Sequence, residues 1–212
     1  NGTLNEATTW TEADLSTIHK FFDFEDVKPN DYGEDTISLH VNNNDSYLCA
    51  NVKLTSNDDN TQTEPEGLVD GNALETGELA SLVNFLWWAD DGDNVLEDNE
   101  SVISEGPIGT LGVGGSVTVP LADSQNNIWT GVGGPVPGNQ TKYIGKAWCF
   151  GDIAGAPLAQ DNATTRSPAG DNDGVNGAGK PEDGGVTCNG SALNNVSQTD
   201  SLTADVTFTA TQ

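Results

Sequence analysis

The chain has 212 residues, with 33 acidic against seven basic side chains and a formal net charge of -26. This charge repels phosphate backbones and anionic lipid surfaces, which argues against nucleic-acid and membrane-surface partners. No apolar run approaches the ~20 residues that span a bilayer, so we expect no membrane insertion. The same carboxylates keep a protein dispersed and offer the hard oxygen ligands that Ca²⁺ prefers.

Hydrophobic residues make up 34% of the chain and 25 residues are glycine, a balance typical of a modest core with much surface loop. β-Sandwiches often reach this length as one unit, so we expect a single domain over residues 1–212. Residues 1–20 are polar and form a separate N-terminal segment. A capping-like sequence in this segment predicts a short helix over residues 11–19.

The first clear strand follows a turn that contains Pro29 and Gly33. Residues 36–41 alternate between apolar and polar side chains, which is typical of a sheet with one buried face. Residues 47–54 alternate in the same way after a short Asn/Asp turn. The two segments are therefore predicted to form a β-hairpin.

The rest of the chain is also dominated by short strands. A helix is expected over residues 73–81, after an acidic loop at 56–71. Residues 151–191 are rich in Gly, Pro, Asn and Asp and are expected to form a long loop insertion. Further strands are predicted at 83–88, 117–121, 143–150 and 201–211. Both faces of the 143–150 strand carry apolar side chains, so other parts of the protein could pack on both faces.

This pattern predicts an all-β fold, an antiparallel jelly-roll-like β-sandwich with one short helix and long acidic or Gly-rich loops. Greek-key and jelly-roll wirings both fit the sequence.

Three cysteines allow one pair and one leftover thiol. A bridge between Cys149 and Cys188 would close the long loop, and Cys49 would then be a buried thiol. A disulfide implies an oxidising, extracellular setting. Asn-x-Ser/Thr sequons are consistent with that setting, although a chain rich in Asn, Ser and Thr also produces them by chance; the candidates are Asn1, Asn44, Asn99, Asn139, Asn162, Asn189 and Asn195.

Two Asp-rich turns are candidate Ca²⁺ sites. The first contains Asp90, Asp91, Asp93 and Glu97 around a glycine, and its spacing to the glutamate is too short for an EF-hand. An acidic hairpin turn without a metal explains the same residues equally well, because Asp and Gly favour turns. The second turn contains Asp171 and Asp173, in a region where Gly and Asp are abundant throughout.

The sequence offers little for catalysis, and we expect no catalytic residues. His19 and His40 are the only histidines, without a His-Glu-x-x-His pair or a Gly-x-Ser-x-Gly elbow. His40 is expected on the outer face of its strand. Trp10 and Trp129 are candidate platforms for sugar stacking, which leaves a carbohydrate-binding module or adhesin as an alternative function.

Several runs together resemble the TasA/camelysin family of biofilm-matrix proteins, which are exported with SipW-type signal peptides. In chain order, the runs that carry this resemblance are residues 26–34, 87–94, 143–150, 185–188 and 198–208. The resemblance covers residues 21–211 in patches, and the order of the patches is its main support.

The resemblance implies a jelly-roll subunit that polymerises outside the cell, each copy donating its N-terminal strand to a neighbour. Residues 1–20 depart from the family pattern because they contain few paired apolar positions. Either they donate weakly through Leu4 and Trp10, or the donor lies upstream, or this protein behaves differently. Expected partners are copies of itself in a fibre and cell-surface or matrix polysaccharide. The metallopeptidase label of some family members is not transferred, because the sequence has no recognisable metal-plus-base set.

Overall fold

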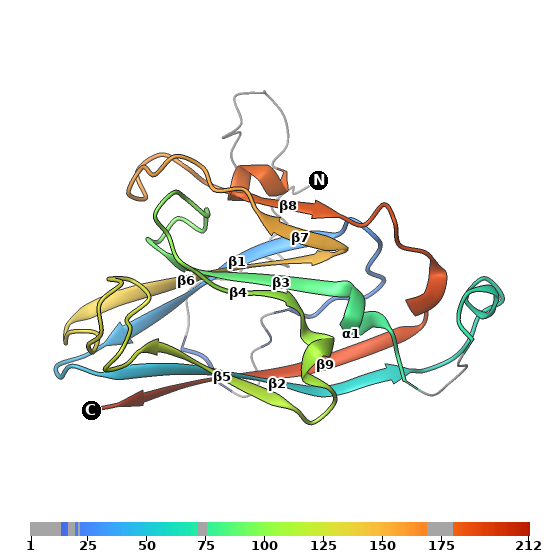
Figure 1. The fold of residues 1–212 in the computed structure, drawn as a ribbon, viewed down its shortest axis with the longest axis horizontal. Coiled ribbons are helices and arrows are strands. Elements are labelled where there is room, and N and C mark those ends of the chain that lie inside the picture. Colours follow the sequence, from blue (N-terminus) through green and yellow to red (C-terminus); the bar gives the residue numbers. More distant parts are fainter. Residues whose placement is uncertain (1–13, 17–19, 21, 72–75, 169–179) are drawn as a thin grey trace.

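The computed structural model describes residues 14–16, 20, 22–71, 76–168 and 180–212. Two antiparallel sheets lie one above the other as a sandwich, in agreement with the predicted all-β class (Figure 1). In spatial order, the four-stranded sheet contains β1 (Tyr32–Val41), β6 (Gln140–Phe150), β3 (Val83–Asp90) and β4 (Val102–Pro107). The three-stranded sheet contains β5 (Ser116–Ala122), β2 (Tyr47–Asp59) and β9 (Asp200–Thr211).

The predicted hairpin between the first two strands is wrong. β1 pairs with β6, whereas β2 lies in the other sheet between β5 and β9. The turn after Val41 therefore carries the chain from one sheet to the other. Alternation identifies a strand and its buried face, but it contains no information about which strand lies beside it.

The helix expected over residues 73–81 is reduced to α1 (Leu79–Leu82) in the part that the structure describes. The carboxylate of Asp200 accepts hydrogen bonds from the backbone N–H groups of Glu78 and Leu79 and so holds the start of α1. β3 begins directly after it, which ends the helix after one turn. The loop expected at 56–71 is also shorter, because β2 continues to Asp59.

Of the helix expected over 11–19, residues 14–16 are described and are not helical; the others lie outside the described residues. The remaining helical pieces are short 3-10 turns: η1 (Glu66–Leu68), η2 (Ile108–Leu111), η3 (Pro181–Gly184) and η4 (Asn195–Ser197).

The four-stranded sheet is covered on both faces, as the 143–150 pattern suggested. Toward the three-stranded sheet it contributes Ile144, Trp148 and Phe150 to the sandwich core. Its opposite face buries Leu86 and Trp88 with a second set of apolar side chains: Leu96, Ala147, Cys149, Ile153 and Val186. The ring of Trp88 lies over Gly145, where an added Cβ would sit 2.2 Å from the indole. Glycine at this position is required by that close approach.

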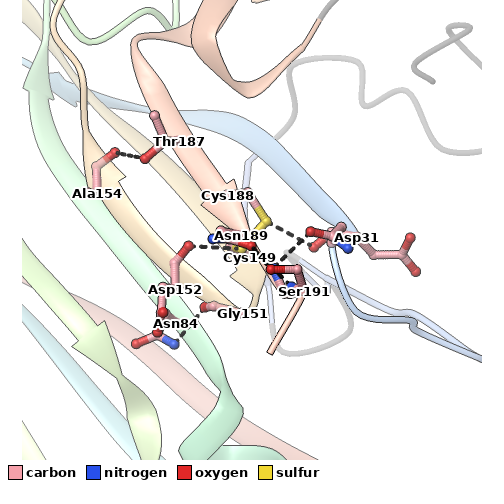
Figure 2. The surroundings of a disulfide bond; sticks show 12 residues. Asp31, Asn84, Cys149, Gly151, Asp152, Ala154, Thr187, Cys188, Asn189 and Ser191 are labelled. Carbon is pink, nitrogen blue, oxygen red and sulfur yellow. Dashed lines mark hydrogen bonds between the residues drawn. A yellow bond between two sulfur atoms is a disulfide. The ribbon is translucent and has the colours of Figure 1, made fainter. Parts of the chain in front are cut away.

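The predicted 151–191 loop is not wholly irregular. It contains β7 (Asp152–Gly155) and β8 (Val186–Asn189), which pair as a two-stranded ribbon over the four-stranded sheet (Figure 1). Residues 169–179 of this segment lie outside the described residues. Figure 2 shows two hydrogen bonds that support the ribbon: Thr187 donates to the carbonyl of Ala154 at 3.3 Å, and Asn84 of β3 donates to the carbonyl of Gly151 at 2.7 Å.

The predicted disulfide between Cys149 and Cys188 is confirmed, with a Cα–Cα distance of 5.6 Å (Figure 2). It joins the end of β6 to β8 and so fastens the ribbon to the sheet. Cys49 is a free thiol, but it is half-buried and not buried as expected. Its neighbours Leu48 and Ala50 take the inward-facing positions of β2.

Removing this bridge should destabilise the fold more than removing the free thiol. The double variant Cys149→Ala/Cys188→Ala frees a loop of 39 residues, for which chain entropy gives a loss of about 4 kcal/mol in the free energy of unfolding. Urea unfolding of purified protein measures the loss. Cys49→Ala is the matched control, and equal unfolding midpoints for the two variants would contradict the structural role of the bridge.

Candidate metal site between strands β3 and β4

The loop from β3 to β4 begins at a buried carboxylate. Asp90, the last residue of β3, is 3% exposed. It accepts a hydrogen bond from the backbone N–H of Asn94 at 3.1 Å and another from Nε1 of Trp88 at 3.3 Å. Gly92 and Asn94 have positive φ values of 123° and 63°, which turn the chain tightly around Asp90.

Four carboxylates predicted from the sequence come together here, and a fifth joins them. Asp90, Asp91 and Glu100 offer oxygens within 4.8 Å of one another, and Asp91, Asp93 and Glu97 form an overlapping group. Glu100 was missed, although it follows Glu97 by three residues. Its carboxylate accepts the backbone N–H of Asp91 at 2.8 Å and that of Glu97 at 2.9 Å, and so closes the loop on itself.

Among the described residues, one cationic side chain, that of Arg166, forms an ion pair with this group. Glu97 is fully buried, and its Oε1 lies 3.0 Å from Nε of Arg166. Its Oε2 accepts the backbone N–H of Asp161 at 3.2 Å. Arg166 and Asp161 both come from the segment after β7, so the site is built from two distant parts of the chain.

Two further oxygens in the loop are buried but have no hydrogen-bond partner among the described residues. They are Oδ2 of Asp93 and Oδ1 of Asn94. Carboxylate and amide oxygens of this kind, gathered by a flexible loop, are the donor set that Ca²⁺ takes. The described acidic groups can therefore hold a metal ion.

Burial makes these carboxylates reluctant to ionise. It raises the pKa of Asp90 to about 7 and that of Glu100 to about 8, and neighbouring carboxylates add to both shifts. The pKa values of Asp91, Asp93 and Glu97 are also raised, chiefly by burial. A bound divalent cation would favour the ionised forms and release these protons.

The second predicted metal turn is not described, because Asp171 and Asp173 lie outside the described residues. A different acidic group, which the sequence did not reveal, joins Asp59, Glu66 and Asp200. Glu66 is buried and accepts hydrogen bonds from Thr63 and Thr199, while Asp200 holds the start of α1. Backbone and hydroxyl donors already engage Glu66 and Oδ2 of Asp200, so we assign these two carboxylates a structural role.

The other candidate residues are dispersed. His40 is exposed on β1, as expected, with its ring within 3.0 Å of Ser38 Oγ and 3.2 Å of Thr141 Oγ1. Trp129 is half-buried and not an open platform, because its ring packs on the core and its Nε1 donates to the carbonyl of Tyr143 at 2.8 Å. His19 and Trp10 lie outside the described residues.

The described sequon asparagines are all exposed, so their side chains are accessible to a modifying enzyme: Asn44, Asn99, Asn139, Asn162, Asn189 and Asn195. Asn1 lies outside the described residues.

The raised pKa values predict how stability depends on pH when a chelator is present. A carboxyl group whose folded pKa exceeds its unfolded value stabilises the fold at low pH, and that contribution is lost as pH rises through the folded pKa. For Asp90 and Glu100 the free energy of unfolding should therefore fall between about pH 4 and about pH 8. Urea titrations at a series of pH values measure this dependence.

Asp90→Asn should flatten the dependence, because the amide does not ionise. Asp98→Asn is the control, since it removes the same charge from an exposed position in the same loop. If both variants kept the slope of the parent protein, burial of Asp90 would not be its cause.

None of the helices in the described part of the chain has the length and apolar character needed to cross a bilayer. The sequence matches no protein-family model and no curated protein.

Proposed function

We propose that this chain is a structural subunit of an extracellular fibre, joined to copies of itself by β-strand addition and stabilised by Ca²⁺. The observation that carries the proposal is an apolar row on the three-stranded sheet that the opposite sheet leaves partly uncovered. The family resemblance in the sequence points to the same assembly.

The apolar row consists of Val52 and its two direct neighbours across the sheet, Val117 and Val206. Val52 lies between Ala50 and Leu54 on the inward face of β2, and both of these are buried. Val52 and Val206 are nevertheless only half-buried, and Val117 is 42% exposed. Inward-facing valines in a completed sandwich are normally covered, so this row favours a missing layer.

The edge of the same sheet supports the proposal. β9 has 12 residues and, in the described part of the chain, pairs only with β2. A long outer strand presents unpaired N–H and C=O groups to any extended segment. A strand added there gains main-chain hydrogen bonds, and its inward-facing side chains lie beside Val206, the member of the apolar row on β9.

The occupant that we propose is an extended N-terminal segment of another copy. Phe22 and Phe24 pack on Trp148, which anchors the segment just before β1 at the sandwich. The sequence predicts no core strand in residues 1–20. This segment is therefore available to pair with the sheet of another copy. The disulfide is compatible with assembly outside the cell.

Two other functions receive less support. Trp129 is partly covered and its indole N–H is engaged, which weakens the case for sugar stacking. The acidic groups of the described residues contain Asp and Glu only, and His40 stands apart from them on β1, which gives a metallopeptidase no metal-plus-base arrangement.

Fibre formation should depend on the apolar row. Val206→Asp places a charge where the donated strand is expected to pack, so negatively stained electron micrographs should show few or no fibres. Thr207→Asp is the control, because the adjacent side chain is exposed on the other face of β9. Circular dichroism confirms that both variants fold. Fibres of normal length from Val206→Asp, or a strictly monomeric parent protein with its complete mature N-terminus, would contradict the proposal.

Calcium should raise the melting temperature of the subunit. Binding to the folded state alone adds ~2.7 kcal/mol when free Ca²⁺ is 100 times its dissociation constant. A calcium titration followed by thermal unfolding measures the shift, and Asp93→Asn should reduce it while Asp98→Asn should not. A melting temperature that stays constant across the titration would remove Ca²⁺ from the proposed function.

A further inference from the structure

A lysine lies inside the sandwich. Lys146 is on the central strand β6 with its side chain 1% exposed, between Ile144 and Trp148 on the face that meets the other sheet. Asp35 of β1 is its direct partner in the antiparallel register. Nζ of Lys146 touches Oδ1 of Asp35, whose side chain is 22% exposed.

Aromatic rings close the space around this pair. The centroid of the Phe22 ring lies 3.9 Å from Nζ of Lys146. Phe22 in turn packs edge-on against Trp148, with ring centroids 6.1 Å apart, and lies 6.1 Å from the ring of Phe85. The amine is therefore shielded from water by side chains of three segments.

The buried setting favours the neutral forms of both groups. It lowers the pKa of Lys146 to about 8 and raises the pKa of Asp35, while their mutual attraction opposes both shifts. Moving the proton from the ammonium to the carboxylate removes two buried charges and leaves a free amine beside a carboxylic acid. An unprotonated amine is a nucleophile, and a protonated carboxyl group is the form that it can attack.

We propose that Lys146 and Asp35 condense into an intramolecular amide bond that links β6 covalently to β1. Nζ of Lys146 attacks Cγ of Asp35, and a C–N bond forms as the C–OH bond breaks. The hydroxyl of the acid leaves with one amine proton as water. No group is oxidised or reduced, so the reaction needs no co-reactant.

Contact between a lysine and an aspartate does not by itself favour this reaction. Two exposed lysine–aspartate pairs in the same chain serve as a comparison. Lys20 lies 2.8 Å from Asp23, and Lys28 lies 2.6 Å from Asp26. All four of these side chains are mostly exposed, so neither pair is removed from water. Only the pair formed by Lys146 and Asp35 combines contact with burial among the ion pairs described between lysine and aspartate.

The link would strengthen a specific part of the fold. β1 is an outer strand of its sheet and follows the N-terminal segment. The amide would tie it to β6, which the disulfide already joins to β8. Tension applied at the N-terminus would then pass through covalent bonds and not only through the hydrogen bonds of one strand pair. This inference is independent of the proposed fibre and holds for a monomer.

Mass spectrometry of the full chain tests the proposal. After disulfide reduction and denaturation, the intact mass should be one water lower than the sequence requires. Proteolysis should yield a branched peptide containing Asp35 and Lys146, whereas peptides with Lys20, Asp23, Asp26 and Lys28 stay unmodified. A full intact mass with separate peptides for Asp35 and Lys146 would overturn the proposal.

Two variants separate the amide from other dehydrations. Lys146→Met replaces the amine by an apolar side chain of similar length that cannot form the amide, so this variant should retain its full mass. A succinimide at an aspartate would still lose water in the variant. Asp35→Asn should lose ammonia and give the same final mass as the condensed parent protein. Water loss that persists in Lys146→Met would assign the mass change to another site and refute the link. The peptide map of the parent protein decides the question even if a variant does not fold.

Discussion

The fold depends on the burial of the four-stranded sheet from both sides. β6 and β3 present Trp148 and Phe85 to the sandwich core, and Ala147, Leu86 and Trp88 to the ribbon of β7 and β8. Two-sided burial lets a chain with 34% hydrophobic residues build a core, because few large side chains fill both layers. The disulfide and the candidate metal loop both lie at the margins of this sheet.

The acidic composition is not only a surface property. About half of the acidic side chains in the described part of the chain are exposed. The loop after β3, however, folds several carboxylates onto one another and places the guanidinium of Arg166 against them. Like charges that are brought together and desolvated destabilise the fold unless protons or cations compensate. The tertiary structure thereby makes the stability of this loop depend on its ionic surroundings.

Two local features run against the usual separation of apolar and charged groups. The valine row around Val52 faces inward but remains partly exposed, while Lys146 is charged in water but buried here. Departures of this kind concentrate where a protein binds or reacts. They lie on different sheets, and each supports a separate proposal.

The all-β class and most strands could be predicted from the sequence, because alternation is a local property of the chain. The Cys149–Cys188 pair could be predicted because the two cysteines flank one long loop. The sequence also located Asp90, Asp91, Asp93 and Glu97, which are close in sequence. Three other features could be seen only in the folded chain: β1 and β2 belong to different sheets, Arg166 contacts Glu97, and Asp35 contacts Lys146. Those contacts join residues far apart in the chain, and their partners are chosen by sheet register and layer packing, which no local pattern encodes.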